Sequence, residues 1–245
     1  MKKLKNINAL LKLDVQLIKP YWPWLLMFFG LALLMGIMMG EGFGFIISWT
    51  IFAGTILAFP FENKEKGNMD MLFASLPTNR KSMIFAKYAS ILIGLGIALI
   101  IGLGVAILLD MIYLQFPLDP VYVEGIYIPQ FRAMELDIYW SMMLTMTALA
   151  VAIYMISVGV QTPFFYKYGY KKGRIFMWIP IILITVVLNL QAILGLFNID
   201  FNIFNIMLSE SINRIITSCI SLGIGVLAFI GSYFLSRKMY LKKDI

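Results

Sequence analysis

Six long apolar stretches, each about as long as a bilayer-spanning helix, constrain this chain more than any other feature. A spanning helix needs about 20 apolar residues, and none of the six stretches has a charged residue in its middle. They cover approximately residues 22–40, 43–61, 83–109, 138–160, 175–197 and 215–235. With 61% hydrophobic and 13% charged residues, a water-soluble fold would leave much apolar surface exposed. We therefore predict an all-α integral membrane protein with six transmembrane helices in one domain, residues 1–245.

The lysine and arginine residues alternate between successive connections, and this alternation predicts the orientation of the chain. All of them except Arg132 and Arg214 fall at the N-terminus, near the second or fourth connection, or in the C-terminal tail. Cytoplasmic loops carry the excess of basic residues. We therefore predict a bacterial cytoplasmic membrane protein with both termini in the cytoplasm. Because this orientation explains the net charge of +7, we expect no nucleic-acid partner.

Residues 3–19 precede the first span and have the pattern of an amphipathic helix. Apolar residues recur on one side at helical spacing, namely Leu4, Ile7, Leu11, Val15 and Ile18. Lysines fall away from this stripe, at Lys5, Lys12 and Lys19. We predict a helix that lies on the inner leaflet with its lysines near anionic headgroups; a disordered basic tail is the alternative. Pro20 and Pro23 mark the bend into the membrane.

The sequence contains no residue pattern typical of catalysis or metal binding. It has no histidine, one cysteine (Cys219), no phosphate-binding loop and no nucleophile elbow. The span interiors hold neutral polar residues such as Thr145, Tyr154 and Asn189, whereas ion-coupled carriers usually have an ionisable residue deep in the membrane. We predict that this chain has no catalytic, cofactor-binding or metal-binding residue and that its energy source is another subunit. Ion coupling through backbone carbonyls stays open.

The connection between the second and third spans, residues 62–82, is the most informative loop. Asn68 is suited to N-cap a helix, Asp70 lies in the first turn where the helix dipole favours an acid, and Pro77 ends the segment. Residues 69–75 are therefore predicted to form a short helix. It presents the apolar side chains Met71, Leu72 and Phe73. Such side chains on a charged loop favour a docking surface; the alternative is that they fold back onto the lipid headgroups.

The sequence here resembles the membrane subunits of ABC-2-type exporters, especially small bacterial permeases such as those of the phenol-soluble modulin exporter. The specific part is the run PFENKEKGNMDMLFASLPTNRKSMIFAKY at residues 60–88, together with the basic start, the six spans and the basic C-terminal stub. In that family the loop is a coupling helix that docks into a cleft on the ATPase subunit. The docking residues implied by position are Asn68, Met69, Asp70, Met71, Leu72, Phe73, Ala74, Ser75, Leu76 and Pro77, with Arg80 and Lys81 flanking them. A minor contact is implied for Tyr166 to Arg174.

The resemblance implies the transmembrane permease half of an ATP-driven exporter. Its partners would be two copies of a separate ATPase subunit, which bind ATP and Mg²⁺, and a second permease chain, identical or different. Because the spans offer few polar recognition groups, we expect amphipathic or hydrophobic substrates, and the resemblance implies small peptides. The alternatives are a secondary or passive carrier not powered by ATP, an intramembrane enzyme, and a membrane anchor that recruits a partner.

Two further patterns bear on helix packing. The third span has a face of small residues at Gly94, Ala98, Gly102 and Ala106. This face favours packing within the chain over a dimer seam. The fourth span has three methionines, Met142, Met143 and Met146. We predict that they face lipid and do not line a site for an apolar ligand.

Overall fold

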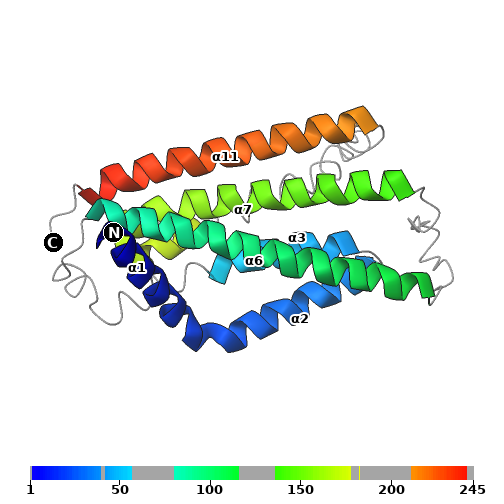
Figure 1. Ribbon diagram of the computed structural model, residues 1–245, viewed down its shortest axis with the longest axis horizontal. Coiled ribbons are helices and arrows are strands. Elements are labelled where there is room, and N and C mark those ends of the chain that lie inside the picture. The colour runs from blue at the N-terminus through cyan, green and yellow to red at the C-terminus, as the bar shows by residue number, and fades with distance from the viewer. Residues whose placement is uncertain are drawn as a thin grey trace.

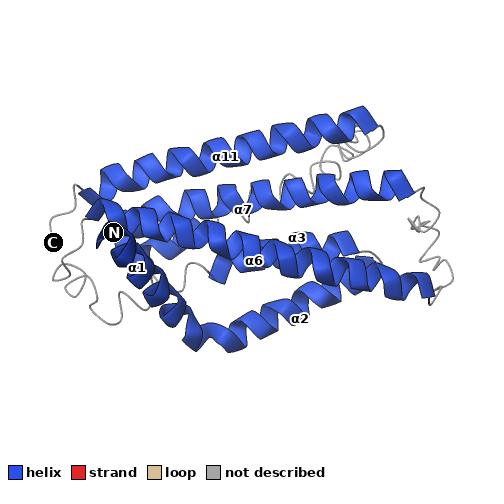
Figure 2. Ribbon diagram, viewed as in Figure 1, coloured by secondary structure: helices blue, strands red, loops and turns tan. Residues whose placement is uncertain are grey.

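The computed structural model describes residues 2–39, 42–56, 80–115, 136–177, 182 and 211–241. Every element in these ranges is helical (Figure 2). In chain order they are α1 (Lys2–Ile18), η1 (Lys19–Tyr21), α2 (Trp22–Met39), α3 (Gly42–Ile56), α6 (Arg80–Gln115), α7 (Leu136–Gly173), η3 (Arg174–Met177) and α11 (Ser211–Leu241). The predicted all-α class is therefore confirmed for the described part of the chain.

Four of the described helices are long and apolar enough to cross a membrane. They are Leu10–Ile37, Lys81–Ile112, Ile138–Gly169 and Ile212–Leu241, and a shorter apolar helix covers Gly44–Ile56. These segments correspond to five of the predicted spans. The predicted span at residues 175–197 lies almost wholly outside the described residues, so the count of six stays a prediction.

The helices form a bundle, with α7 and α11 running in the same direction along each other and with α3 at the centre (Figure 1). Helix α3 packs against α2, α6 and α7, while α11 lies along α7 and also contacts α6. At 36 residues, α6 is about 54 Å long, which exceeds the roughly 30 Å hydrocarbon core of a bilayer. A helix of this length tilts or projects beyond the hydrocarbon.

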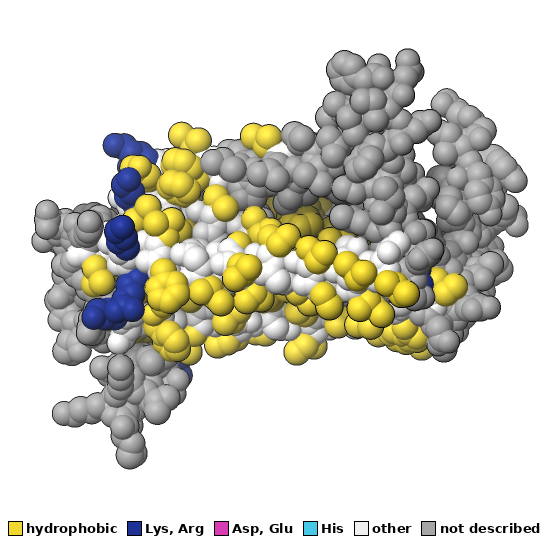
Figure 3. Space-filling view, turned by 90° about the horizontal axis from the view of Figure 1, so that it is seen from above, with side chains coloured by type: hydrophobic (Ala, Val, Ile, Leu, Met, Phe, Trp, Pro, Cys, Tyr) yellow, Lys and Arg dark blue, Asp and Glu magenta, His cyan; other side chains and the backbone are white. Residues whose placement is uncertain are grey.

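The two ends of the bundle differ in charge. We call the end where α6 begins and α7 and α11 end the basic end. Its exposed cations are Lys81, Lys167, Lys171, Lys172 and Lys238. Figure 3 shows Lys and Arg side chains gathered mainly at this end, with hydrophobic side chains along the length of the visible face. This distribution matches a bundle whose middle lies in lipid and whose basic end lies at a headgroup layer.

At the opposite end, Asp110 of α6 joins three helices. Its carboxylate accepts a hydrogen bond from the backbone N–H of Gly42 at 2.8 Å, and a second from the hydroxyl of Tyr139. The first N–H groups of a helix have no partner within the helix and carry partial positive charge. Asp110 therefore caps α3 from a neighbouring helix and links it to the start of α7.

The small-residue face of α6 packs within the chain, as predicted. Ala98 and Ala106 are buried, and the indole Nε1–H of Trp49 in α3 donates to the carbonyl of Ala98 at 3.0 Å. A Cβ atom added at Gly102 would lie 3.3 Å from Cδ1 of Trp49. The small side chains thus let α3 approach α6 closely.

The prediction that the α7 methionines face lipid is wrong. Met142 and Met143 are 8% and 2% exposed, and they form a core cluster with Ile46 of α3 and Ala106 of α6. Met146 packs against this cluster. Because α3 contacts α7 from inside the bundle, this face of α7 turns toward protein.

The N-terminal segment is a helix, as predicted, but its packing differs from the expectation. The bend predicted at Pro20 is the 3₁₀ turn η1, with proline in its first turn. However, α1 packs against α6 through buried Leu10, and Leu17 is also buried, while Val15 from the predicted apolar stripe is 68% exposed. The helix is therefore docked on the bundle, with part of its predicted stripe facing outward.

Candidate functional site at the basic end

The predicted docking residues 68–77 lie outside the described residues. Of the predicted set, the structure describes the two flanking residues: Arg80 begins α6, and Lys81 follows it as an exposed side chain. In Figure 1, α6 begins at the basic end, and α3 runs toward that end. The connection 57–79 therefore precedes, in the sequence, the helix that begins at the basic end.

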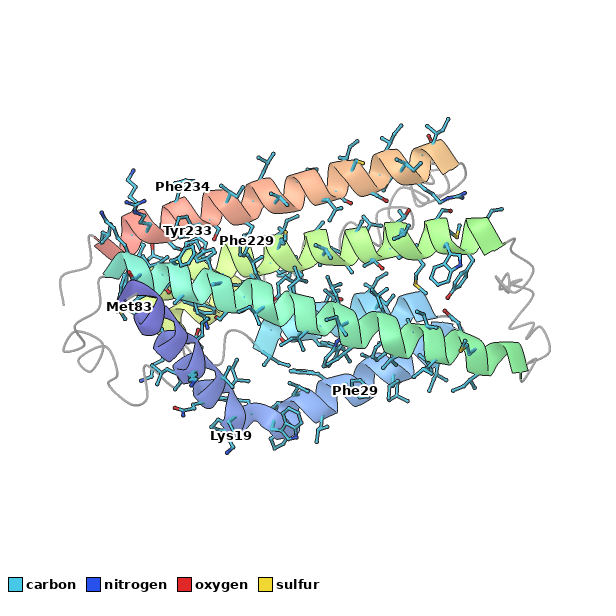
Figure 4. All side chains as sticks on the ribbon, viewed as in Figure 1. Lys19, Phe29, Met83, Phe229, Tyr233 and Phe234 are labelled. Carbon is cyan, nitrogen blue, oxygen red and sulfur yellow. The ribbon has the colours of Figure 1, made fainter. Side chains whose placement is uncertain are left out.

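An apolar contact fixes α1 across the beginning of α6. Leu10 of α1 and Ala86 of α6 are buried against each other, and Leu13 and Met83 pack around them. Figure 4 labels Met83 where the two helices cross near the basic end. The first turns of α6 are therefore covered by α1 on one side.

A charged pair lies beside this apolar contact. The ammonium of Lys87 in α6 is 3.4 Å from Oδ2 of Asp14 in α1, and the two side chains are 2% and 9% exposed. The hydroxyl of Ser90 donates to the same carboxylate oxygen at 2.9 Å. Charges removed from water are tolerated when they are paired and hydrogen-bonded. The three side chains form a polar contact enclosed between two helices.

A hydroxyl network joins α6 to α11 through Tyr88, the residue that follows Lys87. The hydroxyl of Tyr88 is 2.5 Å from Oγ of Ser232 and 2.8 Å from Oγ of Ser236. The rings of Phe229 and Tyr233 contact the Tyr88 ring edge-on, and Figure 4 labels both on α11. In an apolar setting such hydrogen bonds fix the relative position of two helices.

Replacing Tyr88 with phenylalanine is expected to destabilise the bundle by about 0.6–1 kcal/mol, because the two serine hydroxyls lose a partner. Adding Ser232→Ala and Ser236→Ala should recover part of this loss, since no buried hydroxyl then lacks its partner. Unfolding in mixed micelles of graded detergent composition measures the difference. A triple variant less stable than Tyr88→Phe would contradict this account.

The second predicted contact, Tyr166 to Arg174, is a bent helix end. The Tyr166 ring is buried, with its centroid 5.0 Å from that of Tyr240 in α11. Gly169 has φ 73°, a conformation that glycine adopts readily, and it bends the end of α7. Beyond this bend Lys171 and Lys172 are exposed. The segment therefore presents its lysines and buries its first tyrosine.

The polar side chains inside the bundle bond mainly to backbone carbonyls. The hydroxyl of Tyr154 donates to the carbonyl of Ile91 at 3.0 Å, and Thr50 and Thr162 each bond the carbonyl four residues earlier. Asn189 lies outside the described residues. Among the residues that the structure describes, no group of three or more His, Cys, Asp or Glu is placed to hold a metal ion. Of these three bonds, that of Tyr154 joins two helices, and those of Thr50 and Thr162 stay within their own helices.

Sequence reasoning missed the polar contacts of the basic end. Lys87 contributes to the predicted orientation as a basic residue near the second connection, and no partner is predicted for Lys87 or for Asp14. A signal was present, because Asp14 is the one acidic residue in a basic amphipathic segment. The serines at positions 232 and 236 are four residues apart on α11, which places them on one helix face. Only the structure shows which side chain each of them meets.

Comparison with known proteins identifies the family of this bundle. No curated protein and no solved structure matches the chain. The sequence profile described as ABC-2 family transporter protein matches residues 9–241, which includes every described transmembrane helix and the connection at the basic end. The match covers nearly the whole chain, and the protein therefore belongs to the ABC-2 family of transporter membrane proteins.

Proposed function

We propose that this chain is the permease subunit of an ATP-driven exporter whose basic end faces the cytoplasm. ABC-2 permeases are multi-pass membrane proteins, are not themselves catalytic, and generally pair with ABC ATPases. The observation that carries the proposal is that α6, the helix that follows the connection 57–79 in the sequence, begins at the basic end of the bundle. With that end in the cytoplasm, the connection is on the side where ATP is available.

In the proposed mechanism, two ATPase subunits bind ATP and Mg²⁺ and close on each other. Residues 68–77 dock on an ATPase, with Arg80 and Lys81 beside the contact. Because α6 begins at Arg80, only two residues, 78 and 79, separate the docked segment from this helix in the sequence. The contacts of α6 with α3 and α11 then carry the movement to the rest of the bundle.

The proposed substrates are amphipathic or hydrophobic molecules, with small peptides as the specific class. Large apolar side chains cover the outward faces of the described helices, including Ile97 and Ile100 on α6 and Leu227 on α11. The polar groups described inside one chain are largely occupied by backbone carbonyls. A path between two permease chains fits this distribution better than a polar channel through one chain.

The docking proposal is tested by the double substitution Leu72→Asp and Phe73→Asp. We expect this variant to lose its ATPase partner during purification in mild detergent, because two carboxylates would have to be buried in an apolar contact. The control is Asn63→Asp, which adds one negative charge to the same connection outside the predicted helix. Mass spectrometry of the co-purified proteins measures the recovery of the ATPase.

Normal recovery of the ATPase by the Leu72→Asp/Phe73→Asp variant would contradict docking through this segment. Recovery of no ATPase by the unmodified chain would contradict the function itself. The alternative function, a secondary or passive carrier, has its own signature. It would transport substrate in vesicles that contain no ATP, at a rate that follows an imposed ion gradient.

A further inference from the structure

The contact between α1 and α6 contains buried charged and polar side chains, although apolar side chains alone could pack the two helices together. Lys87 and Asp14 are both buried, with their charged atoms 3.4 Å apart, and Ser90 adds a hydrogen bond to the carboxylate. The apolar cluster of Leu10 and Ala86 lies next to them. A contact made only of such apolar residues would hold α1 against α6 at several similar positions.

A buried ion pair favours one position over the others. Replacing such a pair by apolar residues is often neutral for stability, whereas removing one partner leaves an uncompensated charge. Its best-attested role is to fix the register of two packed helices. Any slip of α1 along α6 separates Asp14 from both Lys87 and Ser90. The pair therefore makes the α1–α6 contact selective for one arrangement.

The location of the pair gives this selectivity a mechanical consequence. Lys87 lies about two helical turns after Arg80, where the connection 57–79 enters α6. Asp14 lies in the last turns of α1, which continues through the turn η1 into α2. The prolines at positions 20 and 23 stiffen this bend, because each fixes its own φ angle. A displacement at the start of α6 thus has a short, stiff route to α2.

We propose that Asp14 and Lys87 form a latch that makes α1 move with the beginning of α6 and passes that movement to α2. The latch rests on the proposed function, since an ATPase on the connection 57–79 supplies the displacement. The latch gives the displacement a second route through the protein. One route enters the bundle through α6 itself, and the other reaches α2, which packs on the central helix α3.

The first measurement tests whether the Asp14–Lys87 pair holds α1 against α6, and it needs no ATPase. Spin labels on Val15→Cys and Phe85→Cys, in a Cys219→Ser background, report the α1–α6 distance in lipid nanodiscs. Val15 and Phe85 are 68% and 51% exposed, so the labels lie away from the buried pair. We expect one narrow distance distribution. Lys87→Met keeps the side-chain length but removes the charge, and it should broaden the distribution.

Three further variants make this result specific to the pair. Asp14→Asn keeps the size of the side chain and should also broaden the distribution, because it leaves the buried charge of Lys87 uncompensated. The double variant Asp14→Asn/Lys87→Met leaves no buried charge and should be narrower than Lys87→Met alone. Lys12→Gln removes an exposed charge of α1 and should change nothing. A distribution as narrow in Lys87→Met and Asp14→Asn as in the unmodified pair overturns the latch.

The second measurement tests whether movement of α6 is passed to α2, and it uses the permease with its co-expressed ATPase. The native Cys219 on α11 is exposed and carries one label, while the other is placed on Leu34→Cys in α2 or on Phe85→Cys in α6. We expect trapping with ATP and vanadate to shift both distances. In Lys87→Met, or in Asp14→Asn if the former does not fold, the α6 shift should persist and the α2 shift should be lost.

An α2 shift that persists in these variants overturns transmission through the latch. Failure of the proposed function has a different signature. In that case neither distance shifts in the unmodified chain. No displacement of α6 then occurs, and there is no movement for the latch to pass to α2. The nanodisc measurement still decides independently whether the pair fastens α1 to α6.

Discussion

Replacing Gly42 with valine is expected to give the largest loss of stability among single substitutions at the end of the bundle opposite the basic end. A Cβ atom at position 42 would lie 2.7 Å from the carbonyl oxygen of Ala106, 2.7 Å from Oδ2 of Asp110 and 2.8 Å from Cβ of Ala106. Two of these atoms belong to well-packed parts of α6, which cannot rotate away. Relief therefore requires α3 to move off α6, which breaks the hydrogen bond from Gly42 to Asp110.

Overpacking of this kind typically costs about 1–3 kcal/mol, and the loss of the cap on α3 adds about 1 kcal/mol. The measurement is the thermal midpoint of the purified chain, followed by size-exclusion chromatography in detergent. Gly104→Val on α6 is the control, because a Cβ atom added there would meet nothing within 4 Å. Equal midpoints for the two variants would show that the close approach at Gly42 contributes nothing to stability.

Replacing Trp49 with alanine is expected to be comparably damaging at the centre of the bundle. Trp49 is 3% exposed and lies among α2, α3 and α6. Its ring meets Phe29 edge-on at 5.4 Å between centroids and donates a hydrogen bond to Ala98. Figure 4 labels Phe29 on α2. Removal of the indole leaves a cavity facing the small residues of α6, which have no side-chain atoms with which to fill it.

In soluble proteins the change from tryptophan to alanine costs about 3–5 kcal/mol, of which the packing part persists in a membrane. Trp49→Phe keeps an aromatic ring but removes the N–H donor, so it should cost much less. Detergent-graded unfolding of both variants separates ring packing from the hydrogen bond. Equal losses for alanine and phenylalanine would assign the effect to the hydrogen bond and contradict the packing argument.

Several features of the fold were predictable because lipid acts as a solvent that selects long apolar segments. The start of α2, the long third span and the N-terminal helix all agree with the sequence pattern. The bend at Pro20 was predictable because proline fixes its own φ angle. The family could be predicted from the run at residues 60–88, and the profile match supports it independently. The docking residues 68–77 stay a prediction.

Some features were predicted wrongly or missed because they depend on which helices become neighbours. The span predicted at residues 83–109 ends before Asp110, whereas α6 extends to Gln115 and places Asp110 against the start of α3. Met142 and Met143 were assigned to lipid but lie in the core. The pair of Asp14 and Lys87 joins two segments that are far apart in the chain. The local sequence around Asp14 or around Lys87 does not indicate that the two residues are in contact.

The sequence by itself determined that this protein is helical, embedded in a membrane and basic on alternate connections, and it pointed to the ABC-2 family. Only the tertiary structure decided which face of each helix is inside. On α6, Ile91 is 1% exposed and Ile100 is 75% exposed, although the two residues are chemically identical. In water, a hydrophobic stripe marks the buried side of a helix. In lipid, both sides are apolar, so the inner face is selected by close packing and by hydrogen bonds such as those of Trp49, Tyr88 and Asp14.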